Sequence, residues 1–386
     1  MKTPNVLFLT ESQNADWGHV KDTIEGLRQH VTIVTIVIYS EKYLEIGSSG
    51  LKKLLSETII QEHVDIVVVF MGITCILDPW FLSKISNMLG CKIVLIFTDA
   101  EHSFENHDKY YAQCADLSWL FAAPMEGFFN IHNFPTYAKQ GFYLPKYQST
   151  NVDKDISVSF IGGIYRADRK EYLDFLSKNG VDVFVAGYDS PRGEVDFLEK
   201  NSIISRSKIH LNFTKVQNKS KNINVRLRQQ KGRPIEASLL NTFVLSESYS
   251  GLEMVFDQND EIPTFEDKQD LLEKIKYYLV NPEQRDAATK KAHLKSLEYD
   301  SEIVAKEMLS KLASIKSKEK RFIADKVFLE KYVAQRYYFF GFFLIHGKFY
   351  LALDELKAIF KLNYFQFNFL SYHLPRGVYR GFKRSI

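Results

Sequence analysis

Residues 231–247 of this chain, KGRPIEASLLNTFVLSE, combine a cation and a carboxylate at a spacing suited to ligand binding. Pro234 favours the first turn of a helix, because its missing N–H has no partner to lose there. Arg233 and Glu236 would then share that first turn. Asn241 stands where the helix should end in a residue of positive φ, a role that asparagine fills in place of glycine. The segment predicts a helix whose start presents Arg233 and Glu236 at the edge of a sheet.

A second helix start follows at residues 251–256 (GLEMVF) and brings another carboxylate, Glu253. A carboxylate in such a place can accept two hydrogen bonds from a ribose diol, and an arginine can hold a diphosphate through charge-assisted contacts. The alternative is that Glu236 and Glu253 only stabilise helix N-termini, an effect of about 0.3–1 kcal/mol. The residue chemistry by itself leaves both interpretations open.

A glycine pair, Gly162 and Gly163, separates an expected strand from an expected helix in residues 160–169 (FIGGIYRADR). Glycines allow the backbone to approach a ligand, and the N–H groups of a helix start favour an anion. Arg166 and Arg169 could add charge-assisted contacts to a phosphate. The simpler interpretation is a tight turn between strand and helix. The run is not the dinucleotide-binding fingerprint GxGxxG.

Three polar residues that could take a proton follow the strand expected at residues 92–97: Asp99, Glu101 and His102. In open parallel sheets the carboxyl ends of the strands face the ligand cleft, so these side chains should lie there. Glu11 follows the first strand in the same way. A catalytic base would take the proton of an acceptor hydroxyl, and its geometry decides whether it qualifies. Ordinary solvated loop polarity is the alternative for each of these residues.

We expect no metal site in this chain. The literal DxD run at Asp153–Asp155 lies in a polar segment before a strand and is typical of a solvated turn. The ten histidines form no cluster with ligand spacing. Cys75, Cys91 and Cys114 are odd in number and irregularly spaced, which indicates reduced, buried thiols.

The elements that must position these residues follow a repeating order. Apolar runs at 5–10, 31–39, 65–70 and 92–97 alternate with amphipathic stretches such as 16–29 and 51–62. Continuous Val and Ile runs indicate burial on both faces, as in a parallel sheet covered by helices. Strand–helix–strand alternation implies right-handed βαβ units and a doubly wound α/β sheet.

The pattern stops in the polar residues 148–155 and then restarts. Strands are expected at 156–161, 181–186, 209–213 and 242–246, with helices at 167–178 and after residue 267. We therefore expect a Rossmann-like domain at 1–147, a linker at 148–155, a second Rossmann-like domain at 156–320 and a helical extension at 321–386. Two such domains would place their ligands in the cleft between them.

Charge is distributed unevenly along the chain. The formal net charge of +3 is too small to argue for a nucleic-acid partner. Residues 321–386, however, hold 11 Lys+Arg against 4 Asp+Glu, together with 19 of the 54 aromatic residues. The pattern at 336–360 predicts a helical hairpin docked on the body. The last stretch, 363–386, has the chemistry of an interfacial membrane segment, or of a solvated tail.

The span from Ile156 to about Tyr299 resembles the C-terminal domain of the group 1-type bacterial glycosyltransferases of GT-B architecture. It looks closest to the branch that includes the spore-maturation-like glycosyltransferases. The resemblance rests on the runs GRxxEA at 232–237, FVLSE at 243–247, GLExxF at 251–256 and NPE at 281–283, and on the strand, glycine and arginine at 160–169. Looser matches, among them CAD at 114–116, extend into the first domain.

The resemblance implies that a sugar passes from a nucleotide-activated donor to an acceptor in a central cleft, without cofactor or metal. It places Glu236 near the donor ribose, Glu253 nearby and Arg233 at the phosphates. The donor-binding candidates are then Gly162, Gly163, Arg169, Arg226, Arg233, Glu236 and Glu253, and the catalytic candidates are Asp99, Glu101 and His102. Many group 1 enzymes carry a further glutamate where this chain has Arg228, so a retaining or an inverting mechanism stays open.

We therefore expect a cytoplasmic hexosyltransferase-type enzyme of bacterial polysaccharide or glycoconjugate synthesis. Its acceptor would be a glycan, a lipid-linked sugar or a protein, and it would be peripheral on the membrane if residues 363–386 bind there. Two alternatives stay open: a degenerate GT-B protein that binds a nucleotide sugar or glycan without transfer, and a membrane-recruited platform. A sugar-nucleotide epimerase is a weaker third, distinguished by needing no acceptor.

Overall fold

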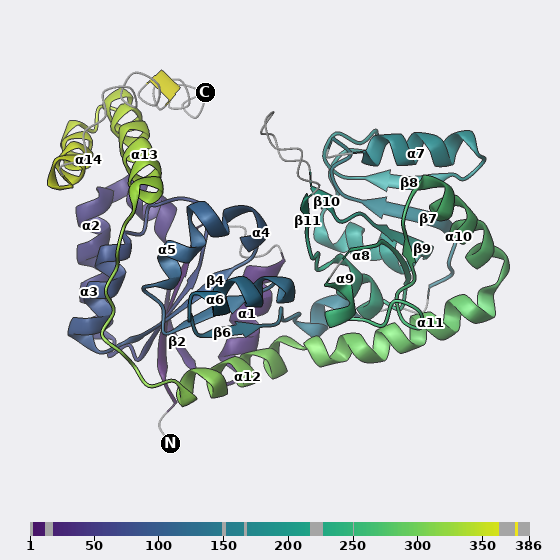
Figure 1. Cartoon of the computed structure of the whole chain (residues 1–386), viewed down its shortest axis with the longest axis horizontal. Helices are drawn as coiled ribbons and strands as arrows, with labels where there is room; N and C mark the ends of the chain where they lie inside the picture. The colour runs from purple at the N-terminus through teal and green to yellow at the C-terminus, as the bar shows by residue number, and fades with distance from the viewer. Residues whose placement is uncertain are drawn as a thin grey trace.

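The chain folds into two α/β domains that lie side by side, with a pair of helices at the outer end of the first (Figure 1). The computed structural model describes residues 3–11, 18–148, 152–165, 168–216, 227–249, 251–362 and 375–376. Each domain is built on one parallel sheet covered by helices. The predicted architecture of two Rossmann-like domains with a helical extension is confirmed.

The first domain holds six strands in the order β2-β1-β3-β4-β5-β6, all parallel. The strands are β1 (Asn5–Thr10), β2 (Thr32–Ile38), β3 (Ile66–Phe70), β4 (Lys92–Phe97), β5 (Leu117–Leu120) and β6 (Thr136–Ala138). The helices are α1 (His19–Arg28), α2 (Tyr39–Gln61), α3 (Pro79–Leu89), α4 (Ala100–Ser103), α5 (Asp108–Ala112) and α6 (Glu126–Ile131). The central strands β1, β3 and β4 are buried along almost their whole length, as their apolar runs predicted.

Strand β2 differs from the expectation for its sequence. Its run of Val, Ile and Thr predicts burial on both faces, yet only Val37 of the strand is buried. The reason is its place at the edge of the sheet, beside β1 alone. Helices cover the centre of a sheet more fully than its edge, so an unbroken β-branched run predicts a strand without predicting its burial.

The second domain holds five parallel strands in the order β13-β12-β9-β7-β8. They are β7 (Ile156–Ile161), β8 (Val183–Ala186), β9 (Ser207–Asn212), β12 (Phe243–Glu247) and β13 (Thr264–Phe265), and a small antiparallel pair joins β10 (Lys215–Val216) to β11 (Leu227–Arg228). The helices are α7 (Arg169–Lys178), α8 (Phe197–Ser205), α9 (Arg233–Leu239), α10 (Lys268–Val280) and α11 (Pro282–Ser296).

Helix α12 (Ser301–Ser314) leaves the second domain and packs on α1 of the first, which differs from the boundary expected at residue 320. Its apolar stripe, which includes Val304 and Met308, is buried in the same cluster as the first sheet. Two glycines permit the close approach. A Cβ added to Gly26 would lie 2.3 Å from the Ser301 carbonyl oxygen, and one on Gly141 would lie 2.9 Å from the Ser301 Cα.

The chain therefore crosses between the domains twice, and the two crossings are bonded to each other. The Phe142 N–H donates to the Tyr299 carbonyl at 2.8 Å, and the Ser301 N–H donates to the Phe142 carbonyl at 2.9 Å. These bonds join the end of the first domain to the segment that returns from the second.

The extension forms the predicted helical hairpin, α13 (Lys326–Ile345) and α14 (Phe349–Lys361), docked on the first domain. Helix α13 begins earlier than the apolar run at 336–345 indicates, because Asp325 caps it and accepts from the Phe328 N–H at 3.0 Å. At the centre of the hairpin Arg336 is fully buried, with Nη1 at 2.9 Å from both the Tyr43 hydroxyl and Glu355 Oε2.

Two further sequence expectations concern the thiols and the tail. Cys75, Cys91 and Cys114 are all buried and unbridged, and burial raises the pKa of Cys91 to about 11. The proposed membrane segment at 363–386 lies outside the described residues apart from 375–376. Across the described part of the chain, no helix combines the length and the apolar character needed to cross a bilayer.

Candidate functional site

Each sheet has one point where the strand order reverses, and ligands of open α/β sheets bind there, outside the carboxyl ends of the strands. In the first domain this point lies between β1 and β3, and in the second it lies between β7 and β9. The residues that follow these strands are therefore the ones to inspect first.

At the end of β7, the structure brings together four of the predicted donor-binding residues. A Cβ on Gly162 would lie 3.0 Å from Arg233 Nη2, so the glycine lets this guanidinium lie close against the backbone. Arg169 Nη1 donates to the Gly163 carbonyl at 2.8 Å. Both guanidinium groups lie against the Phe160 ring, 5.6 and 5.5 Å from its centre. The edge of β7 is therefore lined by glycine backbone and two positive charges, a combination suited to phosphate.

The local structure of this edge follows from the sequence. Helix α9 begins at Arg233, with Pro234 in its first turn, as predicted. Asn241 adopts the predicted positive φ, at 52°. The strand β12 follows at once, so the short helix fixes Arg233 and Glu236 at the sheet edge.

Glu236 is buried and already engaged. Its Oε1 lies 2.8 Å from Lys200 Nζ and 3.3 Å from the Tyr147 hydroxyl. Burial alone would raise the pKa of this carboxyl, but the nearby charges of Lys200, His19 and Arg233 outweigh burial and lower its pKa to about 2. Glu236 is therefore ionised, and it faces the first domain.

A buried polar network, which no local sequence pattern predicts, connects Glu236 to helix α1. Asp22 accepts from Lys146 Nζ at 2.9 Å and from the Tyr147 hydroxyl at 3.2 Å. His19 Nδ1 lies 2.6 Å from Gln140 Nε2, and burial lowers the pKa of its imidazole. His19 begins the helix after β1, so the reasoning that selected Glu11 could have found it too.

Lys200 completes this network, but no sequence pattern marks it as a site residue in the way that the position after β1 marks His19. It lies inside helix α8, and nothing in its local sequence marks it as different from other helical lysines. Its role depends on a contact with Glu236, 36 residues away along the chain.

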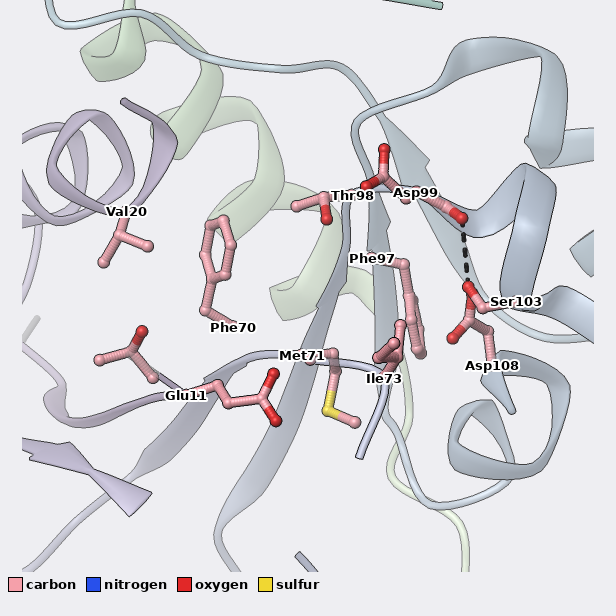
Figure 2. A pocket seen from close by; sticks show the side chains of 12 residues that line it. Glu11, Val20, Phe70, Met71, Ile73, Phe97, Thr98, Asp99, Ser103 and Asp108 are labelled. Carbon is pink, nitrogen blue, oxygen red and sulfur yellow. Dashed lines mark hydrogen bonds between the residues drawn. The ribbon is translucent and has the colours of Figure 1, made fainter. Parts of the chain in front are cut away.

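In the first domain, a cavity of about 360 Å³ opens at the ends of β1, β3 and β4 (Figure 2). Three carboxylates, those of Glu11, Asp99 and Asp108, lie around it (Figure 2). The remaining lining is largely apolar, and the whole set is Thr10, Glu11, Val20, Phe70, Met71, Gly72, Ile73, Phe97, Thr98, Asp99, Ser103 and Asp108. Carboxylate acceptors beside aromatic and aliphatic side chains suit a polyhydroxylated ligand with apolar faces.

Two of the three proposed catalytic residues meet the second domain. Gln229 Nε2 donates to Asp99 Oδ1 at 3.3 Å, and the Gln230 N–H donates to Glu101 Oε1 at 3.2 Å. Burial raises the pKa of Glu101 to about 7, and its Oε2 is buried without a hydrogen-bond partner among the described residues. His102 is exposed and does not line the cavity.

Solved structures with the same arrangement of domains show what fold this is. Sucrose-phosphate synthase from Thermosynechococcus elongatus is 12% identical, with a TM-score of 0.55 over 80% of this chain and 98% of that one. HepE of Anabaena in complex with UDP-glucose is 12% identical, with a TM-score of 0.56 over 80% and 99%. A glycosyltransferase from Rickettsia africae is 11% identical, with a TM-score of 0.55 over 82% and 99%. These likenesses show the GT-B fold.

Residues 166–310 match the family model described as "Glycosyl transferase-like". The chain therefore has the GT-B fold, and its second domain matches a glycosyltransferase-like family model. No curated protein matches it at the sequence level. The match begins just before Arg169 and covers every predicted donor-binding residue of the second domain except the glycine pair.

Arg228, where this chain departs from the group 1 pattern, pairs with a buried carboxylate. Arg228 Nη1 lies 3.3 Å from Glu247 Oε1, and Lys215 Nζ lies 3.1 Å from the same oxygen. Glu247 is buried at the end of β12 and also accepts from the Thr214 N–H at 2.9 Å. A glutamate at position 228 would place two carboxylates together here, whereas the arginine neutralises Glu247.

Glu253, another of the predicted donor-binding residues, bonds within its own turn. Glu253 is exposed, and its Oε2 accepts from the Gly251 N–H at 2.8 Å and from Gln258 Nε2 at 3.2 Å, so it caps its own turn. Arg226 lies outside the described residues.

Asp155, from the DxD run, pairs with Arg206 Nε at 2.8 Å. Within the described ranges, no three His, Cys, Asp or Glu side chains are grouped so as to hold a metal ion.

Proposed function

We propose that this chain is a glycosyltransferase, which takes a hexose from a UDP-sugar bound at the β7–β9 edge and transfers it to a sugar hydroxyl in the first-domain cavity, without a metal ion. One observation carries the proposal. Where the strand order of the second sheet reverses, the side chains are cations, Arg169 and Arg233. Where the order of the first sheet reverses, carboxylates line a cavity. HepE of Anabaena, which shares the fold, was solved with UDP-glucose and with UDP and glucose, in support of this donor class.

The proposed binding of the donor rests on the charged side chains at the end of β7 and the start of α9. Arg169 and Arg233 would neutralise the diphosphate as it leaves, which is the task a metal ion performs elsewhere. Arg226 is a further candidate on sequence grounds alone. Glu236 would accept hydrogen bonds from the ribose diol, since its lowered pKa keeps it ionised at all physiological pH values. Glu253, on the same edge, stays a secondary candidate for the ribose.

The acceptor side follows from shape and polarity. Glu11, Asp99 and Asp108 would accept hydrogen bonds from sugar hydroxyls, and Phe70 and Phe97 would cover the apolar face of the ring. Such a cavity fits the terminal sugar of a glycan or of a lipid-linked acceptor, consistent with a role in the synthesis of a bacterial polysaccharide or glycoconjugate.

Two carboxylates compete for the role of general base, on different grounds. Asp99 lines the cavity and so has the better geometry. Burial raises the pKa of Glu101 to about 7, and a base is most effective when its pKa lies near the working pH. We propose Asp99 as the group nearest the acceptor hydroxyl and Glu101 as the group that sets the pH dependence of the reaction.

A thermal-shift panel tests the donor site without requiring the acceptor. Wild type, Glu236→Ala and Arg233→Gln are melted with UDP-, GDP-, CMP- and dTDP-sugars, and each shift is taken relative to the same variant without ligand. A ligand that binds only the native state raises apparent stability by RT ln(1 + [L]/Kd). We expect a shift with UDP-sugars that both variants lose.

The matched control is Glu283→Ala, an exposed first-turn glutamate of α11, which should keep the full shift. Loss of the shift in the control, or an unchanged shift in both site variants, would show that the donor does not bind where we place it. A donor that shifts the melt but is never transferred to any sugar acceptor would favour a degenerate binding protein.

A further inference from the structure

Helix α14 exposes an apolar face that nothing in the described structure covers. Phe349, Tyr350, Leu353 and Phe360 are 64%, 74%, 54% and 61% exposed. At 100° per residue these side chains fall on one arc of the helix, about a third of its circumference. The opposite face buries Ala352, Glu355 and Ile359 against α13 and the first domain.

The lysines of α14 share this exposed arc. Lys357 and Lys361 are exposed, and Lys357 Nζ lies 6.0 Å from the centre of the Tyr350 ring. The surrounding segment is basic as well, with 11 Lys+Arg against 4 Asp+Glu in residues 321–386. Aromatic and aliphatic side chains edged by lysines are what an interfacial helix presents to anionic lipid headgroups. A second copy of this face would instead bring like charges together.

The position of the helix allows such contact. In Figure 1 the hairpin lies at the outer end of the first domain, away from the second domain. A flat surface could therefore reach α14 without touching the second domain.

The hairpin is also tied to the cavity of the first domain. On α13, Gln335 Oε1 accepts from the Cys75 N–H at 2.5 Å, and Arg336 donates to the Cys75 carbonyl. The segment just before Cys75, residues 71–73, lines the cavity. A surface bound by α14 would therefore lie on the same body as the proposed acceptor site.

From the exposed stripe, its lysines and its place in the fold, we infer that the outward face of α14 docks on an anionic lipid surface. This face consists of Phe349, Tyr350, Leu353, Lys357, Phe360 and Lys361. The inference goes beyond sugar transfer and does not depend on the donor or on the catalytic assignment.

Vesicle flotation of the full chain tests it. Wild type is mixed with vesicles of phosphatidylcholine and phosphatidylglycerol, or of phosphatidylcholine alone. The outward-face variant Phe349→Ser/Leu353→Ser/Phe360→Ser is compared with Leu198→Ser/Val280→Ser/Leu294→Ser, which removes three exposed apolar side chains of the second domain. A charge variant, Lys357→Glu/Lys361→Glu, is compared with Lys276→Glu/Lys318→Glu at two other exposed lysines.

We expect wild type and both controls to float with the anionic vesicles, and the two α14 variants to lose about tenfold or more in partitioning. Because all the altered side chains are exposed, their melting temperatures and donor-induced shifts should match wild type, which separates this test from that of the proposed function. Wild type that ignores anionic vesicles, or α14 variants that bind like wild type, would overturn the inference. So would a wild-type dimer that the apolar variant converts to a monomer, since the face would then join two copies.

Discussion

Glu101 illustrates how the environment of one residue sets its chemistry. It lies where the two domains meet, with one oxygen bonded to the Gln230 N–H and the other buried without a partner among the described residues. Burial raises its pKa from 4.5 to about 7. At neutral pH it is therefore divided between the two protonation states, as suits a group that exchanges a proton during a reaction.

Replacing Glu101 by glutamine should remove the rise of kcat/KM with pH that the ionisation of Glu101 produces. If Glu101 must be ionised, kcat/KM of wild type rises with pH through about 7, and Glu101→Gln loses both this limb and about 10²-fold or more in rate. Asp99→Asn should lower the rate while the limb stays near pH 7. A wild-type limb that persists in Glu101→Gln would assign the titration to another group.

The same group predicts a pH dependence of stability. The folded pKa of Glu101 exceeds 4.5, so between pH 4.5 and about 7 the folded state binds more protons than the unfolded state. The free energy of unfolding should therefore fall as pH rises through this window, by up to about 3 kcal/mol for this one group. Urea unfolding of wild type and Glu101→Gln at several pH values measures the difference, which should grow toward pH 7. A difference that is constant with pH would show that Glu101 titrates normally in the folded chain.

The two arginines at the end of β7 predict that transfer needs no divalent metal ion. If Arg169 and Arg233 neutralise the diphosphate, transfer should be unchanged by EDTA, and Arg233→Gln should lower kcat about 10²-fold or more. Assays of initial rate with and without EDTA, Mg²⁺ and Mn²⁺ decide this. Activity lost in EDTA and restored by a divalent cation would contradict metal-independent transfer.

At the scale of the elements, the hairpin depends on a buried ion pair. Arg336 and Glu355 are both fully buried, and their 2.9 Å contact joins α13 to α14. Removing one partner leaves the other charged and buried, so Arg336→Met should cost about 3–5 kcal/mol of unfolding free energy. The double variant Arg336→Met/Glu355→Leu should recover most of the loss. Urea unfolding measures both, with Lys170→Met from an exposed pair as a control of little effect. A double variant as unstable as the single one would show that the pair acts chiefly through its packing.

The sequence predicted these elements well because their signals are local. Apolar runs gave β1, β3, β4, β7, β9 and β12, and Asn241 ended its helix in the expected conformation. Strands β5 and β6 were not predicted, and they are short, with four and three residues. The place of β2 at the sheet edge, and of α12 on the first domain, depend on contacts between distant segments, which no local pattern records.

The residues of the candidate site also fall into two groups, those that a local sequence pattern predicts and those that only the fold brings together. Gly162, Gly163, Arg169 and Arg233 belong to one strand–helix turn and to the helix start beside it, and the structure gathers them as expected. Their role in donor binding stays a prediction. The partners of Glu236, which are Lys200 and Tyr147, come from other elements and could be found only once the fold was known.

At the scale of the whole molecule, Gly251 sets how closely the domains approach. It has a φ of +117°, and a Cβ added to it would lie 2.2 Å from Pro124 Cγ of the first domain. Gly251→Ala should therefore push the domains apart and lower kcat. Gly180→Ala is the matched control, because Gly180 also has a positive φ but nothing lies within 4 Å of its added Cβ. Both variants should lose stability through backbone strain, of order 1–3 kcal/mol. Equal kcat of the two variants, at a temperature well below melting, would show that the close contact between Gly251 and Pro124 is not needed for activity.

The paired crossings of the chain limit how the two domains can move. Because Phe142 is hydrogen-bonded to Tyr299 and to Ser301, both covalent connections pass through one place instead of two separate ones. Sliding one domain along the other would break these bonds, whereas swinging it about the line that they define would preserve them. An opening of the domains that keeps these bonds would therefore be a rotation about this line, and side chains that face each other across the domains would separate along arcs centred on it.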